Sequence, residues 1–168
     1  MLAVIDKLTH RNANLLGFLA CVGLMGYALY AQEFLDLAPC PLCVFQRIGV
    51  IAVGIVFLLA AVHNPGTAGR KIYGVLIALA AAAGGGVAAR HIWLQSLPEE
   101  DVPACGPGLD FMMDTFPVLE VLEMVFTGSG ECAEIDWVFL GLSMPAWVLI
   151  AFVFLGIYGI YVNFARLR

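Results

Sequence analysis

Charged side chains are scarce in this sequence. Asp, Glu, Lys and Arg make up 12% of its 168 residues, about half the share of a typical soluble domain, which excludes a water-soluble globule. Lys and Arg number eight and the net charge is −5, which argues against nucleic-acid binding. Disorder is excluded as well, because 62% of the residues are hydrophobic and the mean hydropathy is +0.94. An integral membrane protein remains.

The sequence also lacks internal repeats and low-complexity linkers, so residues 1–168 are expected to form a single membrane domain. Spanning a hydrocarbon core of about 30 Å takes about 20 helical residues. Four apolar runs approach or exceed that length and predict an all-α, four-transmembrane-helix bundle: 15–31, 43–62, 72–89 and 137–162. Pro145 lies within the last run and predicts a kink there.

Basic residues cluster on one side of the predicted spans. Lys7 and Arg11 precede the first run, Arg70 and Lys71 separate the second from the third, and two more arginines follow the fourth. By the positive-inside rule, both termini are cytoplasmic and the loops 32–42 and 90–136 face outward.

The first run could instead be a cleaved signal peptide. A cut after Ala31 would place the bulky Leu29 three residues before the cleavage point, where a small residue is needed. We therefore expect this run to be retained as a span.

Five cysteines are many for a chain of this length. Cys40 and Cys43 end the first outer loop, and Cys105 and Cys132 lie in the second. All four face a compartment in which disulfides can persist. Cys21 lies inside the first apolar run and is expected to pack as a small apolar residue.

The motif Cys40-Pro-Leu-Cys43 stands where the second span begins. Pro41 suits the first helical position, which makes Cys40 the expected N-cap and places Cys43 in the first turn. A helix N-terminus stabilises a thiolate. Arg47 follows Cys43 by one turn on the same face, and an arginine at the membrane edge indicates a functional site.

Glycines flank both Cys105 and Cys132. A bridge between these cysteines would close a 28-residue loop, and it would be worth roughly 3.6 kcal/mol as a purely structural disulfide. Exposed disulfides, however, tend to be the labile, catalytic ones. A zinc site built from all four cysteines is the other alternative, but their spacing fits no compact zinc module. We favour two redox-active pairs, because both face one compartment and Arg47 stands beside one of them.

No cofactor motif accompanies the cysteines. There is no GxGxxG, and Val44, not histidine, follows the Cys-x-x-Cys motif. Thiol exchange is reversible, so net oxidation needs a more oxidising final acceptor. A lipid-soluble quinone is the simplest such acceptor for a membrane protein.

Several motifs resemble the disulfide bond formation protein B family of bacterial inner-membrane thiol–quinone oxidoreductases. The matching segments are Pro39-Cys40-Pro41-Leu42-Cys43 with Arg47, His91 with Leu94-Gln95, Gly130-Glu131-Cys132-Ala133-Glu134, and Phe139-Leu140-Gly141-Leu142 with Met144-Pro145 and Trp147. The resemblance covers residues 39 to 150.

The resemblance implies an electron relay from the periplasm into the membrane. A periplasmic thioredoxin-fold thiol oxidant (DsbA-like) would be the partner and would form a mixed disulfide with Cys105. Cys132 would then exchange with the Cys40–Cys43 pair, and Cys43 would face the quinone. The activity implied is that of a protein-disulfide:quinone oxidoreductase, which sustains disulfide formation in exported proteins.

The resemblance also assigns the quinone-binding residues. By resemblance, Arg47 is one of them and His91 is a second. Without the resemblance, His91 would be interpreted as a histidine at the membrane interface. Ubiquinone is the preferred quinone and menaquinone the alternative. No metal is expected.

The segment 117–126 is expected to form a short helix in the membrane interface, because Glu120 and Glu123 share one face and apolar residues fill the rest. We interpret it as a tether that keeps Cys132 near the membrane surface.

Two rival functions remain. One is a non-enzymatic four-span scaffold with a stapled loop, which Cys43 and Arg47 at the lipid edge argue against. The other is a reductase of the vitamin K epoxide type, in which the Cys-x-x-Cys motif would be expected late in the chain.

Overall fold

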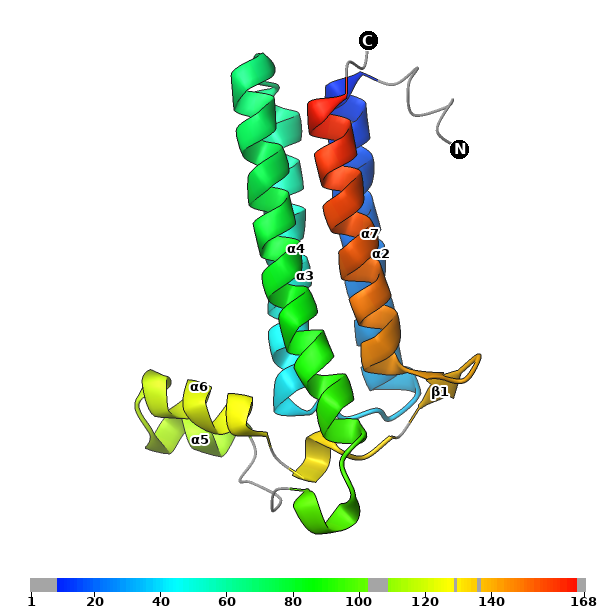
Figure 1. Cartoon of the computed structure of the whole chain (residues 1–168), viewed down its shortest axis with the longest axis vertical. Coiled ribbons are helices and arrows are strands. Elements are labelled where there is room, and N and C mark those ends of the chain that lie inside the picture. Colours follow the sequence, from blue (N-terminus) through cyan, green and yellow to red (C-terminus); the bar gives the residue numbers. More distant parts are fainter. Residues whose placement is uncertain (1–8, 103–108, 129, 136, 166–168) are drawn as a thin grey trace.

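Four long helices run side by side in the computed structural model (Figure 1), which describes residues 9–102, 109–128, 130–135 and 137–165. They are α2 (His10–Phe34), α3 (Pro41–His63), α4 (Thr67–Gln95) and α7 (Met144–Phe164). Each is long and apolar enough to cross a membrane. The predicted all-α, four-helix membrane architecture is therefore confirmed.

The fourth predicted span begins too early. Helix α7 starts at Met144, and residues 138–143 form a small antiparallel hairpin of β1 (Val138–Phe139) and β2 (Leu142–Ser143). Leu140 and Gly141 make its turn with φ values of 52° and 79°, the left-handed conformations that a two-residue hairpin turn needs.

Pro145 consequently lies in the first turn of α7 and not in its interior. Its missing N–H breaks no hydrogen bond within the helix there. The kink predicted at Pro145 was therefore wrong.

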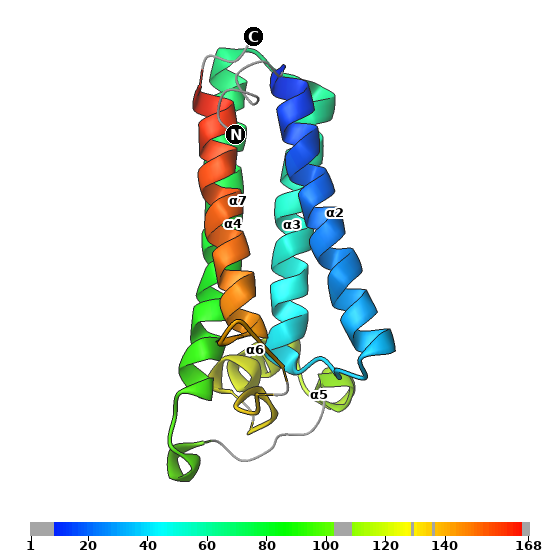
Figure 2. The same ribbon diagram turned by 90° about the vertical axis from the view of Figure 1, so that its right-hand side faces the viewer.

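Small residues let aromatic rings fill the spaces between the helices. Figure 2 shows α2 beside α3 and α4 beside α7. Gly84 of α4 faces the buried ring of Phe152 on α7, and Gly17 of α2 faces that of Phe57 on α3. Cys21 is 3% exposed and packs at Gly54 of α3, which confirms it as a packing residue.

The end of the bundle where α2 begins and α7 ends is closed by polar contacts. The amides of Asn14 and Asn163 bond reciprocally at 3.0 and 3.3 Å. His10 Nδ1 lies 2.9 Å from the carbonyl oxygen of Val162. All three side chains are buried, so their pairing satisfies polar groups that would be costly to leave unpaired in lipid.

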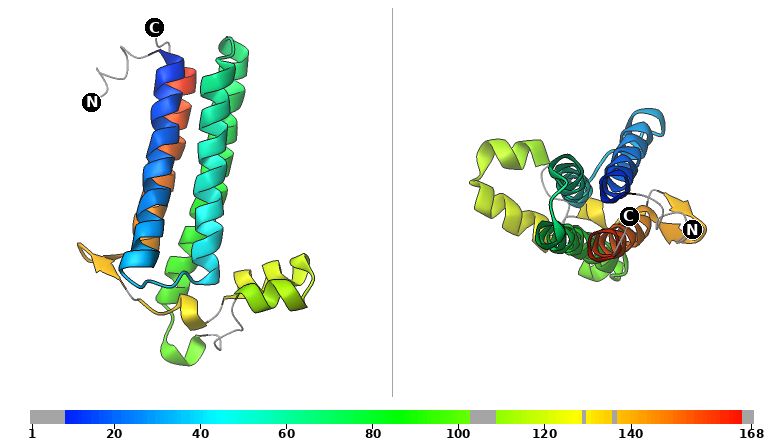
Figure 3. Two further views of the ribbon diagram at one scale, coloured as in Figure 1. Left: turned by 180° about the vertical axis from the view of Figure 1, so that it is seen from behind. Right: turned by 90° about the horizontal axis from the view of Figure 1, so that it is seen from above.

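The opposite end, which we call the loop end, carries the short elements. These are η1 (Glu99–Asp101), α5 (Leu109–Thr115), α6 (Val118–Thr127), η2 (Gly130–Cys132) and the hairpin. Helices α5 and α6 lie together and project sideways from the bundle (Figure 3). The short helix predicted in the second loop is thus present as α6, and its contact with the membrane stays a prediction.

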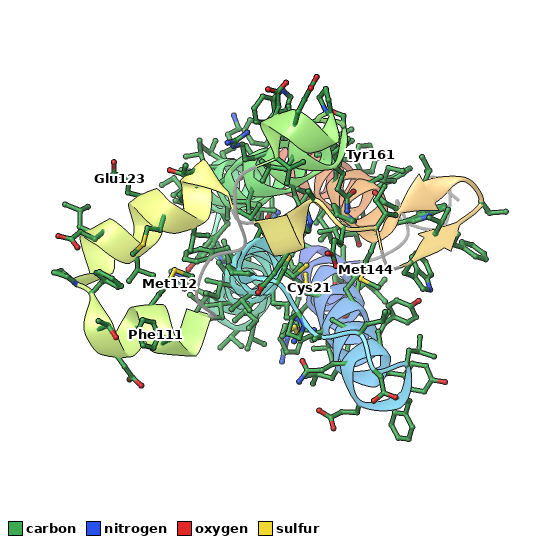
Figure 4. All side chains as sticks on the ribbon, turned by 90° about the horizontal axis from the view of Figure 1, so that it is seen from below. Cys21, Phe111, Met112, Glu123, Met144 and Tyr161 are labelled. Carbon is green, nitrogen blue, oxygen red and sulfur yellow. The ribbon has the colours of Figure 1, made fainter. Side chains whose placement is uncertain are left out.

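A second hydrophobic cluster joins these elements to the bundle. It contains the buried Met112 of α5, Val121 and Val125 of α6, Leu42 of α3 and Leu94 of α4, together with Cys132. Seen from the loop end, η2 lies over the middle of the bundle, with α5 and α6 on one side and the hairpin on the other (Figure 4). This packing places Cys132 beside the start of α3 and the end of α4.

Candidate redox site

The Cys-x-x-Cys motif opens α3 as the sequence predicts. Cys40 is the N-cap, with extended backbone, and Pro41 lies in the first turn. The sulfur of Cys40 accepts a hydrogen bond of 3.4 Å from the backbone N–H of Cys43. The two Sγ atoms lie 2.8 Å apart. The helix start thus holds both sulfur atoms within reach of each other.

His91 reaches this pair from α4. Its side chain is 3% exposed, and its Nε2 lies 3.9 Å from Cys40 Sγ. Helix packing thus buries the ring against the cysteines, and the role of His91 in quinone binding stays a prediction.

Gln46 orients the ring of His91. Its side-chain Nε2 lies 2.9 Å from His91 Nδ1, and Gln46 itself is 4% exposed. Because the amide nitrogen donates, Nδ1 accepts, and Nε2 carries the ring proton toward the sulfur atoms. Sequence reasoning missed Gln46. The available signal was a polar residue three positions after Cys43 and directly before Arg47, at the start of a helix that is otherwise mostly apolar.

Cys132 completes the cluster. It is 1% exposed in η2, and its hydrogen bond with Cys40 is the main cause that raises the pKa of the Cys40 thiol, with the contact to Cys43 and burial adding to it. Residues distant in sequence, Cys40 and Cys132, are therefore neighbours. Cys105, the fourth predicted cysteine, lies outside the described residues.

Arg47 lies on the α2 side of the site. Its Nη1 donates to Gln32 Oε1 at 2.6 Å, and its Nη2 donates to the carbonyl oxygen of Ala28 at 3.2 Å. The guanidinium therefore joins α3 to α2 near the helix start, while His91 supplies the ring nitrogen at the sulfur atoms.

The cluster offers two kinds of chemistry. Three soft or borderline ligand atoms, from Cys40, Cys43 and His91, lie within 4.8 Å of one another and could hold a metal ion, a combination that suits zinc. The same sulfur atoms, with Cys132 beside them, suit thiol–disulfide exchange.

Comparison with known proteins decides the family. The family profile described as "Disulfide bond formation protein DsbB" matches residues 10–162. The chain belongs to the disulfide bond formation protein B family.

Curated relatives align with this chain over most of their length. A disulfide bond formation protein B from Methylobacillus flagellatus is 51% identical over 156 residues, which cover 93% of this chain and 94% of the relative. One from Chromobacterium violaceum is 56% identical over 146 residues, covering 87% and 88%. One from Saccharophagus degradans is 54% identical over 145 residues, covering 86% and 87%.

Membership of the disulfide bond formation protein B family, together with four membrane-spanning helices, establishes the broad activity. The chain is a disulfide-forming oxidoreductase and a multi-pass protein of the bacterial inner membrane. The non-enzymatic scaffold is thereby excluded.

Proposed function

We propose that the chain reoxidises a periplasmic, DsbA-like thioredoxin-fold thiol oxidant and passes the electrons to a membrane quinone, ubiquinone in preference to menaquinone. The single observation that carries this proposal is the burial of Cys132 against Cys40 at the start of a membrane helix. That contact joins the cysteine pair of the long loop to the pair at the membrane edge.

The first half of the relay joins the partner to Cys105 and links Cys132 to Cys40. A partner thiolate attacks Cys105 Sγ, which forms a mixed disulfide and breaks the Cys105–Cys132 bond. The released Cys132 thiolate attacks Cys40 and breaks the Cys40–Cys43 bond. The position of Cys132 beside Cys40 supports this direction of attack.

The second half restores the long-loop pair. The partner's second thiolate attacks its own mixed-disulfide sulfur, which oxidises the partner and frees Cys105. Cys105 then attacks Cys132 and re-forms their bond, leaving Cys40 and Cys43 as a dithiol that holds the two electrons and two protons taken from the partner.

A bound quinone supplies a two-electron, two-proton acceptor for that dithiol. The residues at the helix start fit such a group: the N–H of His91 Nε2 and the guanidinium of Arg47 are hydrogen-bond donors suited to carbonyl oxygens. Gln46 holds the His91 donor in place. Cys43, one helical turn before Arg47, is the sulfur that we assign to face the quinone.

Anaerobic mixing of the purified protein with reduced partner and quinone tests the proposal, with the quinone absorbance as the readout. Replacing any of Cys40, Cys43, Cys105 or Cys132 by serine should abolish turnover. Cys21→Ala is the matched control and should retain it, because Cys21 only packs between α2 and α3. Turnover that survives the loss of either pair would contradict the relay.

A further inference from the structure

Arg90, near the loop end of α4, is bonded to the last residues of α6. Its Nε donates to the carbonyl oxygen of Phe126 at 3.1 Å, and its Nη2 donates to that of Thr127 at 3.0 Å. The last carbonyls of a helix have no partner within it and carry partial negative charge. The guanidinium therefore caps α6 from a neighbouring helix.

The guanidinium is itself held in place. It lies over the ring of Trp93, 4.1 Å from the ring centroid, a favourable cation–π geometry. Arg90 is thus fixed on its own helix at one side and bonded to α6 on the other.

A second contact with α4 follows directly after the capped carbonyls. Gly128 ends α6 with a φ of 97°, and a Cβ there would lie 2.8 Å from Cδ1 of Leu94. Leu94 is fully buried and stands one turn after Arg90. Two successive turns of α4 therefore hold the chain where α6 ends.

The distance from this anchor to Cys132 is short. Cys132 follows Thr127 by five positions, and five residues of fully extended chain reach at most about 18 Å. Between Arg90 and Leu94 lies His91, whose Nε2 is 3.9 Å from Cys40 Sγ. The anchor of the segment on α4 is therefore next to the residue of α4 that contacts Cys40, the destination of Cys132.

We propose that Arg90 is a positioning residue, which fixes the end of α6 on α4 and so keeps Cys132 at a high effective concentration beside Cys40. The inference rests on the proposed relay, in which Cys132 must return to Cys40 in every cycle. Arg90 acts through the carbonyls of Phe126 and Thr127 and not on the sulfur atoms.

The equilibrium between glutathione and the Cys40–Cys132 pair tests this role. In a Cys43→Ser/Cys105→Ser protein, one glutathione disulfide oxidises the two thiols, and two glutathione thiols carry away the electrons and protons. Arg90→Met should lower the equilibrium constant by about tenfold, because the effective concentration of Cys132 falls when its anchor is lost. Arg90→Lys, which retains a cationic donor, should recover part of the loss.

Two controls separate positioning from general damage. In a Cys105→Ser/Cys132→Ser protein, the Cys40–Cys43 equilibrium should be unchanged by Arg90→Met. Arg70→Met should change neither equilibrium, although Arg70 also donates to a backbone carbonyl, that of Pro65, at the other end of α4.

The outcomes are distinct. A loss confined to the Cys40–Cys132 pair supports the role of Arg90, whereas no loss, or equal loss at both pairs, overturns it. Failure of the parent protein to form the Cys40–Cys132 disulfide would overturn it too. Because the assay contains neither partner nor quinone, failure of the proposed quinone reduction would leave its result intact.

Discussion

The half-buried thiol of Cys40 lies beside two other sulfur atoms, which favours its protonated form. Its hydrogen bond with Cys132, its contact with Cys43 and its burial all raise its pKa above that of an ordinary cysteine. Only a thiolate is an effective nucleophile. In the fully reduced protein, Cys40 is therefore expected to react slowly at neutral pH.

The pH dependence of Cys40 alkylation checks this expectation. A raised pKa means that the thiolate appears only at higher pH, so the rate should still be rising where ordinary thiols have reached their plateau, above about pH 10. Cys132→Ala removes the largest cause of the shift and should move the profile to lower pH. Mass spectrometry of iodoacetamide-treated protein gives the rates. Cys21→Ala is the control, and a profile unchanged by Cys132→Ala would contradict the contact.

Arg47 offers a second test at the residue scale. Arg47→Met should raise the KM for quinone by about tenfold, because losing a hydrogen bond from a charged group typically costs about 1.5–3 kcal/mol. The exchange between reduced partner and the long-loop pair should keep its rate. Steady-state quinone titrations and stopped-flow partner oxidation separate the two effects. An unchanged KM with slower partner exchange would show that Arg47 serves the loop and not the quinone.

At the scale of elements, the packing of α4 on α7 depends on where its glycines fall. A Cβ at Gly84 would overlap the ring of Phe152, whereas a Cβ at Gly86 meets nothing within 4 Å. Gly84→Ala should lower the free energy of unfolding by about 1–3 kcal/mol through overpacking. Gly86→Ala should be neutral or stabilising, because alanine favours helix. Denaturant unfolding in mixed micelles measures both, and equal effects would contradict this packing.

Element boundaries show where hydropathy misleads. Residues 137–143 are mostly apolar, so their composition predicts a membrane span. The structure instead places a hairpin there, because Leu140 and Gly141 adopt left-handed conformations and the indole N–H of Trp147 donates to the carbonyl oxygen of Phe139 at 3.1 Å. Hydropathy reflects the free energy of transferring side chains into lipid and contains no information on such local backbone geometry. Cys40-Pro41, in contrast, was a local signal, and the helix start that it predicted was confirmed.

At the scale of the whole molecule, the sulfur cluster and the chain ends are separated by the length of the bundle. Helix α2 begins and α7 ends at one end, and η2 lies at the other (Figure 1). The basic residues predict that the first end is cytoplasmic. In a cysteine-free protein, Glu100→Cys should react with a membrane-impermeant thiol reagent added to intact spheroplasts, and Thr67→Cys only after permeabilisation. The reverse pattern would invert the orientation.

The site as a whole could be predicted only in part. Spans and the Cys-x-x-Cys helix start follow from local composition and capping, and the resemblance supplied the roles of the four cysteines, Arg47 and His91. The contacts of His91 with Gln46 and Cys40, which are 45 and 51 residues away, depend on how α3 packs on α4. No local pattern encodes such a contact.

The central claim is that electrons leave the protein from the Cys40–Cys43 pair. The most direct measurement mixes fully reduced protein with one equivalent of quinone under anaerobic conditions, quenches the reaction with acid at intervals, and maps the disulfides. The account predicts that the Cys40–Cys43 disulfide forms in step with the loss of quinone absorbance and before the Cys105–Cys132 disulfide. Quinone reduction with Cys40 and Cys43 still as thiols, or with Cys105–Cys132 oxidised first, would contradict it.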